Sequence, residues 1–291
     1  MAEGALKLCL CCTATRMRRC DVKYVEKVLF AVRRLLSAIF CISGVFLLLL
    51  PPSLAAVNVN HLPLVAIVFD DAHRSFPYAV DRMHHEGLVG TVYVPTKLVG
   101  VYDFHATWKD IENAQDNGWE IANHSATHAN LTKISIASVV DEIDQSSKDL
   151  ERHGIRATSF AAPYGEFTRD IQSVVMMRFS TNRMAWGESV ILPENLDVRA
   201  IPVFDLSHAG TSYSSMESIL QKALDTQGLV VIVFHKIAMG SPTDSVDKFT
   251  VRKSDFDLFL RKVSELRDQD KLQCVTVSGG VQEISERIRS K

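Results

Sequence analysis

Cysteine is scarce in most of this sequence, because five of its 6 cysteines lie before residue 42 and only Cys274 lies in the long remainder. A single cysteine cannot close an internal disulfide, which excludes a small disulfide-stapled fold for that remainder. Cys9, Cys11 and Cys12 cluster early, but no second ligand pair follows them at the spacing of a zinc site. We therefore interpret the early cysteines as incidental to the fold.

A strong charge of either sign is also missing, since 32 Lys and Arg stand against 34 Asp and Glu, for a net charge of -2. This balance gives no electrostatic reason to expect a nucleic-acid partner. No linker rich in Pro, Gly or Ser, no internal repeat and no low-complexity tract follows the amino-terminal region. With 47% hydrophobic residues, residues 57–291 are predicted to form one domain around one core.

The longest apolar run lies near the amino terminus, at residues 35–50. Lys27, Arg33 and Arg34 precede it, and Pro51 with small residues follows it, which is the pattern of a secretory signal peptide. The run is shorter than the roughly 20 residues that span a bilayer comfortably, so cleavage is favoured over an uncleaved signal anchor.

Residues 1–56 are thus expected to be an amino-terminal extension with a signal peptide or signal anchor, and Met17 is an alternative start to Met1. The protein is expected to be exported, either periplasmic or extracellular, with tethering to the inner membrane as the alternative. Any membrane contact is expected only through this segment, if it stays uncleaved.

Short apolar runs alternate with amphipathic stretches through the rest of the chain. The predicted strands are 64–69, 88–94, 119–122, 156–160, 196–204, 229–234 and 274–277. The predicted helices are 76–85, 107–117, 134–153, 168–177, 214–226, 254–268 and 280–289. Alternation of this kind predicts an α/β fold with parallel strands, and about seven strands favour a barrel over an open sheet.

Candidate functional residues follow four of these strands. They are Asp70 and Asp71 after the first, His124 after the third, the turn at 163–165 after the next, and His235 after the run 229–234. In a βα barrel the carboxyl ends of the strands form the face on which active sites are built. We therefore expect these residues to meet at one face of the barrel.

These residue types first indicate a site for a divalent metal ion. His124 and His128 are four apart, so a helical turn over 123–131 would project both imidazoles from one face toward one ion. The Asp71 carboxylate would be the third ligand, leaving a position for water, as in catalytic sites. A histidine pair at this spacing often arises by chance on a surface helix, and it is the neighbouring aspartates that favour the metal.

The remaining residues fit acid–base hydrolysis. Successive side chains of a strand diverge, so one aspartate would bind the ion while the other takes a proton from the activated water. A backbone N–H in the turn Pro163-Tyr164-Gly165 can stabilise an oxyanion, and His235 can protonate a leaving amine. Each of these features also has an alternative without catalysis. The paired aspartates can simply begin a loop, the turn at 163–165 can be only a turn, and His235 can be a half-buried structural histidine. His73 and His105 are the other histidines expected near the mouth of the site.

Four segments resemble, in this order, the motifs of the polysaccharide deacetylase family, the carbohydrate esterases with a NodB-type domain. The family's Thr-Phe-Asp-Asp-Gly, His-Ser/Thr-x-x-His, Arg-x-Pro-Tyr-Gly and Leu-x-His correspond to residues 68–72, 124–128, 161–165 and 233–235. The resemblance covers residues 64–277, nearly all of the predicted domain.

The resemblance implies a distorted (β/α)7 barrel in which Asp70 is the catalytic base and His235 the general acid. It implies that Asp71, His124 and His128 bind zinc or a similar divalent ion such as cobalt or nickel. The Tyr164 amide would help to hold the oxyanion during catalysis, and Pro163 and Tyr164 would bind the substrate. The implied reaction removes acetyl groups from N-acetylated sugars of an envelope or extracellular polysaccharide, which is then the expected partner. The alternatives are an O-acetyl esterase of the xylan type and a non-catalytic glycan-binding barrel.

Two positions depart from the family pattern. Ala72 replaces a glycine, which we expect a first helical turn to tolerate, and Ala161 replaces the arginine that orients the catalytic base. The biofilm poly-N-acetylglucosamine deacetylases look similar in also lacking that arginine. We hypothesise that Arg199 supplies the missing cation and contributes to substrate binding, and that Asp205 is the aspartate that tunes the general acid.

Overall fold

The computed structural model describes residues 61–101, 104–240 and 247–290. The predicted signal segment at 1–56 lies outside these ranges. Within them, no helix combines the length and the apolar character needed to cross a membrane.

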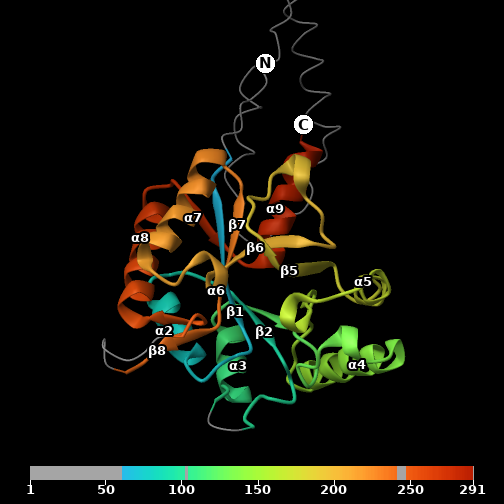
Figure 1. Ribbon diagram of the computed structural model, residues 1–291. Helices are drawn as coiled ribbons and strands as arrows, with labels where there is room; N and C mark the ends of the chain where they lie inside the picture. Colours follow the sequence, from blue (N-terminus) through green and yellow to red (C-terminus); the bar gives the residue numbers. More distant parts are fainter. Residues whose placement is uncertain (1–60, 102–103, 241–246, 291) are drawn as a thin grey trace, which may run out of the picture. The chain divides into compact units, whose positions relative to one another are not determined.

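A closed barrel of parallel strands forms the centre of the described domain (Figure 1). Strands adjacent in the chain are adjacent in the barrel, and β1 pairs with β7 from Leu64↔Leu229 to Phe69↔Phe234 to close it. The strands are β1 (Leu64–Asp70), β2 (Thr91–Val94), β3 (Glu120–Asn123), β4 (Ser159–Ala161), β5 (Thr181–Gly187), β6 (Ile201–Asp205) and β7 (Leu229–Phe234). The expected seven-stranded parallel barrel is confirmed.

The membership of the barrel differs from the prediction at one strand. The run 274–277 was expected to be a barrel strand, but β10 (Gln273–Val275) pairs only with the first half of β1, and β2 pairs with the second half. The place of this predicted strand among the seven is taken by β5, which was not predicted from the sequence. A small parallel pair, β8 (Lys236–Ala238) with β9 (Thr250–Arg252), follows β7.

Helices surround the barrel (Figure 1), and most of those described begin at a side-chain cap. Thr107, Ser135, Thr168, Ser212 and Thr276 each accept a hydrogen bond from a backbone N–H in the first turn of the helix that follows. The helices are α2 (Phe76–His85), α3 (Trp108–Asp116), α4 (Ile136–Arg152), α5 (Arg169–Met176), α6 (Leu206–Ala209), α7 (Tyr213–Thr226), α8 (Lys253–Asp268) and α9 (Val277–Arg289).

Strand β1 divides its side chains between two hydrophobic clusters, as the period of two requires. Val65, Ile67 and Phe69 join the cluster that the surrounding helices cover, where the Phe69 ring lies 5.3 Å from that of Phe234. Leu64, Ala66 and Val68 join the cluster inside the barrel. Continuing this alternation, Asp70 is the next residue on the inner side, where β1 reaches its carboxyl end.

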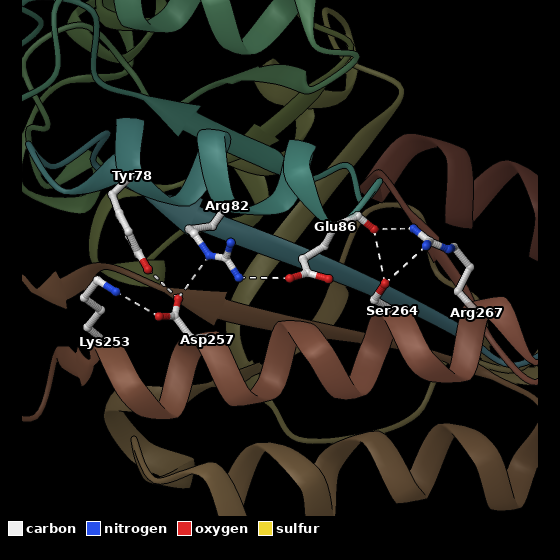
Figure 2. Close-up of polar contacts among 7 residues, drawn as sticks. All are labelled: Tyr78, Arg82, Glu86, Lys253, Asp257, Ser264 and Arg267. Carbon is white, nitrogen blue, oxygen red and sulfur yellow. Dashed lines mark hydrogen bonds and ion pairs between the residues drawn. The ribbon is translucent and has the colours of Figure 1, made fainter.

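Helices α2 and α8 are joined by a set of partly exposed polar contacts, which we call the α2–α8 seam (Figure 2). Asp257 is its centre: it accepts a hydrogen bond from Tyr78, lies 3.4 Å from Arg82 and 2.9 Å from Lys253. At the other end, Ser264 and Arg267 donate to the backbone carbonyl of Glu86. The seam ties together residues about 180 positions apart in the sequence.

Candidate active site

The carboxyl ends of the barrel strands open onto one cavity of about 630 Å³. The predicted residues that line it are Asp70, Asp71, His124, His128, Tyr164, Asp205 and His235, and His73 and His105 also lie there as expected. Four segments that are far apart in the sequence are therefore brought together, because they all follow parallel strands of one barrel.

Asp71, His124 and His128 converge on one point. Asp71 Oδ1 lies 3.1 Å from His128 Nε2 and 3.5 Å from His124 Nε2, and one ligand atom of each residue lies within 4.8 Å of the others. Asp71 Oδ1 is buried and accepts no hydrogen bond of good geometry from the described residues. An oxygen in this situation, beside two imidazole nitrogens, fits a divalent cation.

The outer hydrogen bond of His124 supports the same reading. Its Nδ1 lies 2.8 Å from the carbonyl oxygen of Ala161, which can only accept, so Nδ1 carries the proton. Nε2, on the side of Asp71, is then free to bind a metal. Histidine ligands of metals are usually oriented by such a bond to a carbonyl or carboxylate.

The backbone that presents these ligands differs from the expected helical turn, so that prediction is wrong. Residues 124–130 form a loop in which Ser125 and His128 have φ of 65° and 61°. Asn123 and Ser125 stabilise the loop, since their side chains accept from the N–H groups of Ser125 and His128 at 2.9 and 3.2 Å. Two left-handed residues, rather than a helix, turn both imidazoles toward Asp71.

The backbone directly after β1 is also left-handed. Asp71 and Ala72 have φ of 65° and 46°, so Asp71 leaves the strand alternation and turns toward the histidines. Ala72 was expected in a first helical turn, but α2 begins only at Phe76. Since a left-handed backbone disfavours residues with a Cβ, alanine is strained at a position where the family motif has glycine.

Glu142 of α4 holds the loop that carries the two histidines. Its carboxylate accepts from the N–H groups of Ala126 and Thr127 at 3.0 and 2.8 Å and from the Thr127 hydroxyl at 2.7 Å. These contacts come from a residue that no motif marks, and no local pattern distinguishes it from the other four acidic residues of α4.

The charge state of the triad suits a cation. Burial raises the pKa of Asp71, but its contacts with His124 and His128 outweigh this and hold the pKa well below its usual value. For His128, burial lowers the pKa while Asp71 raises it more, leaving the pKa above its usual value. Asp71 is therefore ionised at neutral pH, and a metal ion would compete with a proton on His128.

Asp70 lies beside this triad with its two oxygens in different environments. Oδ1 accepts a hydrogen bond from the Arg183 guanidinium, and Oδ2 lies 3.9 Å from His235 Nε2. The Arg183 guanidinium carbon lies 4.3 Å from the centre of the Tyr93 ring. Burial lowers the pKa of Arg183, but Asp70 and Tyr93 outweigh it and raise the pKa, so the arginine stays charged.

The hypothesis that Arg199 supplies the cation for the base is therefore corrected. Its side chain is 63% exposed and pairs with Asp197 at 2.9 Å, and it does not line the cavity. Arg183 occupies the expected place from β5. Its strand was missed because its buried residues, Thr181, Asn182 and Arg183, are polar and show no apolar alternation.

The turn Pro163–Gly165 brings Tyr164 to the cavity. Pro163 is buried, whereas Tyr164 has φ of 62° and its ring lies 4.9 Å from that of His128. Gly165 has φ of 70°, and a Cβ there would collide with Ala185 and Trp186, so glycine is required. Asp205 is buried at the end of β6, where its carboxylate caps α6 through the N–H of Ser207.

Aromatic side chains rim the cavity, a feature that was not predicted. Phe104, Tyr164 and Trp186 line it and are 63%, 61% and 47% exposed. His73 lies on the same wall, where burial lowers its pKa to about 4. Exposed aromatics gathered at a concave polar site are typical of a surface that binds a ligand with apolar faces.

The comparisons with known proteins agree with this geometry. Residues 59–177 match the family model described as polysaccharide deacetylase. No curated protein matches the chain.

Several solved structures share the fold. The Bc1960 peptidoglycan N-acetylglucosamine deacetylase is 17% identical, with 75% of this chain and 87% of that chain covered and a TM-score of 0.53. The peptidoglycan deacetylase PdaC from Bacillus subtilis is 20% identical, with 79% of this chain and 94% of that chain covered and a TM-score of 0.50. BA3943 from Bacillus anthracis, described as a pseudoenzyme of carbohydrate esterase family 4, is 13% identical. The match covers 76% of this chain and 66% of that chain, with a TM-score of 0.53.

Identities this low show the fold alone, and one of these relatives is a pseudoenzyme, so the fold does not by itself establish activity. The chain is therefore similar in sequence to the polysaccharide deacetylase family over residues 59–177, and its (β/α)7 barrel presents the triad and Asp70 at the strand ends.

Proposed function

We propose that this protein is a metal-dependent hydrolase that removes acetyl groups from N-acetylated sugars of an envelope or extracellular polysaccharide. One observation carries the proposal: Asp71, His124 and His128, whose ligand atoms fit a metal ion, lie in the same cavity as Asp70 and His235, which approach each other to 3.9 Å. Metal-assisted amide hydrolysis uses both parts, a Lewis-acid site and groups that move protons to and from the reacting atoms.

Zinc is the proposed ion, held by Asp71, His124 Nε2 and His128 Nε2. A bound divalent ion would polarise the acetyl carbonyl and make water acidic enough to attack at neutral pH. Cobalt and nickel take the same ligands, so the metal content of the protein as isolated decides among them.

The protein's own residues would then carry the proton transfers. Asp70 Oδ2 accepts a proton from the attacking water while Oδ1 stays on Arg183, and the Tyr164 N–H stabilises the oxyanion. As the carbon–nitrogen bond breaks, His235 Nε2 gives its proton to the leaving amine. The products are acetate and a free amino sugar.

The shape of the site supports a carbohydrate substrate. A cavity of about 630 Å³ is within the range of sites that enclose a small ligand, and its rim carries Phe104, Tyr164 and Trp186. Sugar rings have apolar C–H faces that pack on such aromatic surfaces. The biofilm poly-N-acetylglucosamine deacetylases also lack arginine at the position of Ala161. Oligomers of N-acetylglucosamine are therefore the first substrates to test.

The test is acetate release by the full chain, stripped of metal with a chelator and reloaded with zinc, from N-acetylglucosamine oligomers. We expect turnover that depends on zinc and is lost in Asp70→Asn, while Asp70→Asn still binds zinc. Acetate released only from acetylated xylan would replace the proposal with an O-acetyl esterase. Glycan binding without acetate release, by zinc-loaded protein, would indicate a non-catalytic barrel.

We also propose that the chain is exported through the segment at 1–56. The support is the sequence pattern of residues 27–56, a positive flank, an apolar run and small residues. Amino-terminal sequencing of the protein recovered outside the cytoplasm should give a new end near Val57. An intact amino terminus in a membrane fraction would indicate an uncleaved anchor instead.

A further inference from the structure

Arg183 and Ala161 are direct neighbours in the barrel, because β4 and β5 pair with Ala161 opposite Arg183. Residues in register on adjacent strands project to the same face of the sheet. Ala161 belongs to the cluster inside the barrel, and both residues are buried, with 0% and 2% exposure. A long side chain from either position therefore enters the same space.

That space leads to Asp70. Tyr93 lies opposite Asp70 in the pairing of β1 with β2, and the same Tyr93 ring contacts the Arg183 guanidinium. Tyr93 and Ala161 also belong to one cluster. The guanidinium is fixed from two sides, since it donates to Asp70 Oδ1 and to the carbonyl of Met184 at 2.9 Å.

We propose that Arg183 is the positioning residue of Asp70 and that positions 183 and 161 are interchangeable for this task. With Oδ1 held by Arg183, the other oxygen of Asp70, Oδ2, lies 3.9 Å from His235 Nε2. The cation has thus moved by one strand from the place where the third motif of the family has arginine. This inference rests on the proposed function, because it assigns a role to Asp70 in turnover.

Burial explains why an arginine is needed somewhere in this space. The Asp70 side chain is 8% exposed and that of Arg183 is 2% exposed, and a carboxylate taken from water must be paired and hydrogen-bonded. The planar guanidinium can bind the carboxylate, the Met184 carbonyl and the Tyr93 ring together, which a lysine ammonium cannot do with the same geometry.

The experiment moves the arginine across the strand pair. The full chains are the wild type, Arg183→Ala, Ala161→Arg and the double variant Ala161→Arg/Arg183→Ala, with kcat, KM, zinc content and Tm measured for each. We expect Arg183→Ala to lower kcat about 100-fold, the order of a misplaced catalytic group, with KM and zinc content within about threefold of wild type. The double variant should regain about tenfold or more of kcat over Arg183→Ala.

Stability gives a second reading of the same exchange. Ala161→Arg alone places two guanidinium groups in one space and should lower Tm, and adding Arg183→Ala should raise Tm again. A merely structural role for Arg183 would not predict that kcat is recovered from position 161. Should Arg183→Ala fail to fold, Arg183→Lys takes its place, with an expected loss of about tenfold in kcat.

Several outcomes would overturn the inference. Folded, zinc-loaded Arg183→Ala with kcat within about threefold of wild type would remove the positioning role. A raised KM at unchanged kcat would make Arg183 a substrate-binding residue instead. A double variant no faster than Arg183→Ala would refute the interchange. Zinc-loaded wild type that releases no acetate overturns the proposed function itself and this role with it, whereas an active wild type confines any failure to Arg183.

Discussion

Two groups of charged residues in this domain differ mainly in their exposure to water. The pair Asp70–Arg183 has side chains that are 8% and 2% exposed, inside the mouth of the barrel. The α2–α8 seam has more contacts, but Arg82 and Asp257 are 27% and 21% exposed, and Lys253 is 45% exposed (Figure 2). Since water screens the seam and not the pair, the single buried contact should matter more than the larger exposed set.

Removing the buried cation should have the largest effect on stability. Arg183→Leu leaves the Asp70 carboxylate buried without its partner, and we expect the free energy of unfolding to fall by about 3–5 kcal/mol in urea denaturation. Arg199→Leu is the matched control, because Arg199 is an exposed arginine paired with an aspartate, and its Tm should not change measurably. A similar Tm for both variants would contradict the comparison.

Glu142, a charged residue of intermediate exposure, should affect the affinity for zinc more than the stability of the fold. Glu142→Gln weakens the acceptor of three hydrogen bonds from the loop that carries His124 and His128. We expect zinc affinity, measured by competition with a chromophoric chelator, to fall about 10–100-fold, as for other residues that orient metal ligands. Asp141→Asn, at the exposed neighbouring position of α4, should leave the affinity unchanged.

The centre of the seam should contribute less, and its contribution should depend on pH. Burial raises the pKa of Asp257, but Tyr78, Lys253 and Arg82 outweigh it and lower the pKa below 3.8. A depressed folded-state pKa gives stability that is present above the unfolded pKa and is lost as pH falls through the folded one. At pH 7 we expect Asp257→Asn to cost about 1 kcal/mol.

The pH dependence separates this reading from lost packing. The difference between wild type and Asp257→Asn in urea denaturation should be constant from pH 7 to about pH 5 and should shrink below about pH 4. A difference that persists unchanged at low pH would show that the carboxylate charge is not what stabilises the seam.

The smallest effect is expected at the exposed pair of Arg199 and Asp197, which are 63% and 44% exposed. Arg199→Ala should leave both Tm and kcat within error of wild type, because the side chain lies outside the cavity and water screens its charge. A tenfold loss of kcat would return Arg199 to the site and would weaken the assignment of Arg183.

Local patterns of the sequence predicted much of the fold. Runs such as 64–69 and 229–234 are apolar because both faces of a parallel strand are covered, and the structure has them as β1 and β7. The site residues were found for a related reason, since polar residues after such strands must lie at one end of the barrel.

The failures have physical causes of the same kind. Strand β5 was missed because the barrel interior at its start is polar, so burial left no apolar pattern to read. The loop at 124–130 was expected to be helical because the spacing of two histidines cannot reveal left-handed residues between them. The α2–α8 seam joins residues about 180 positions apart, and no local pattern encodes such a contact.

Strand β1 closes the barrel against β7 and ends in Asp70, which Asp71 directly follows. Any opening between these two strands would separate Asp70 from His235, which directly follows β7. Such an opening should stop turnover while the rest of the sheet is still paired, so that on gentle heating loss of turnover should precede the main unfolding transition.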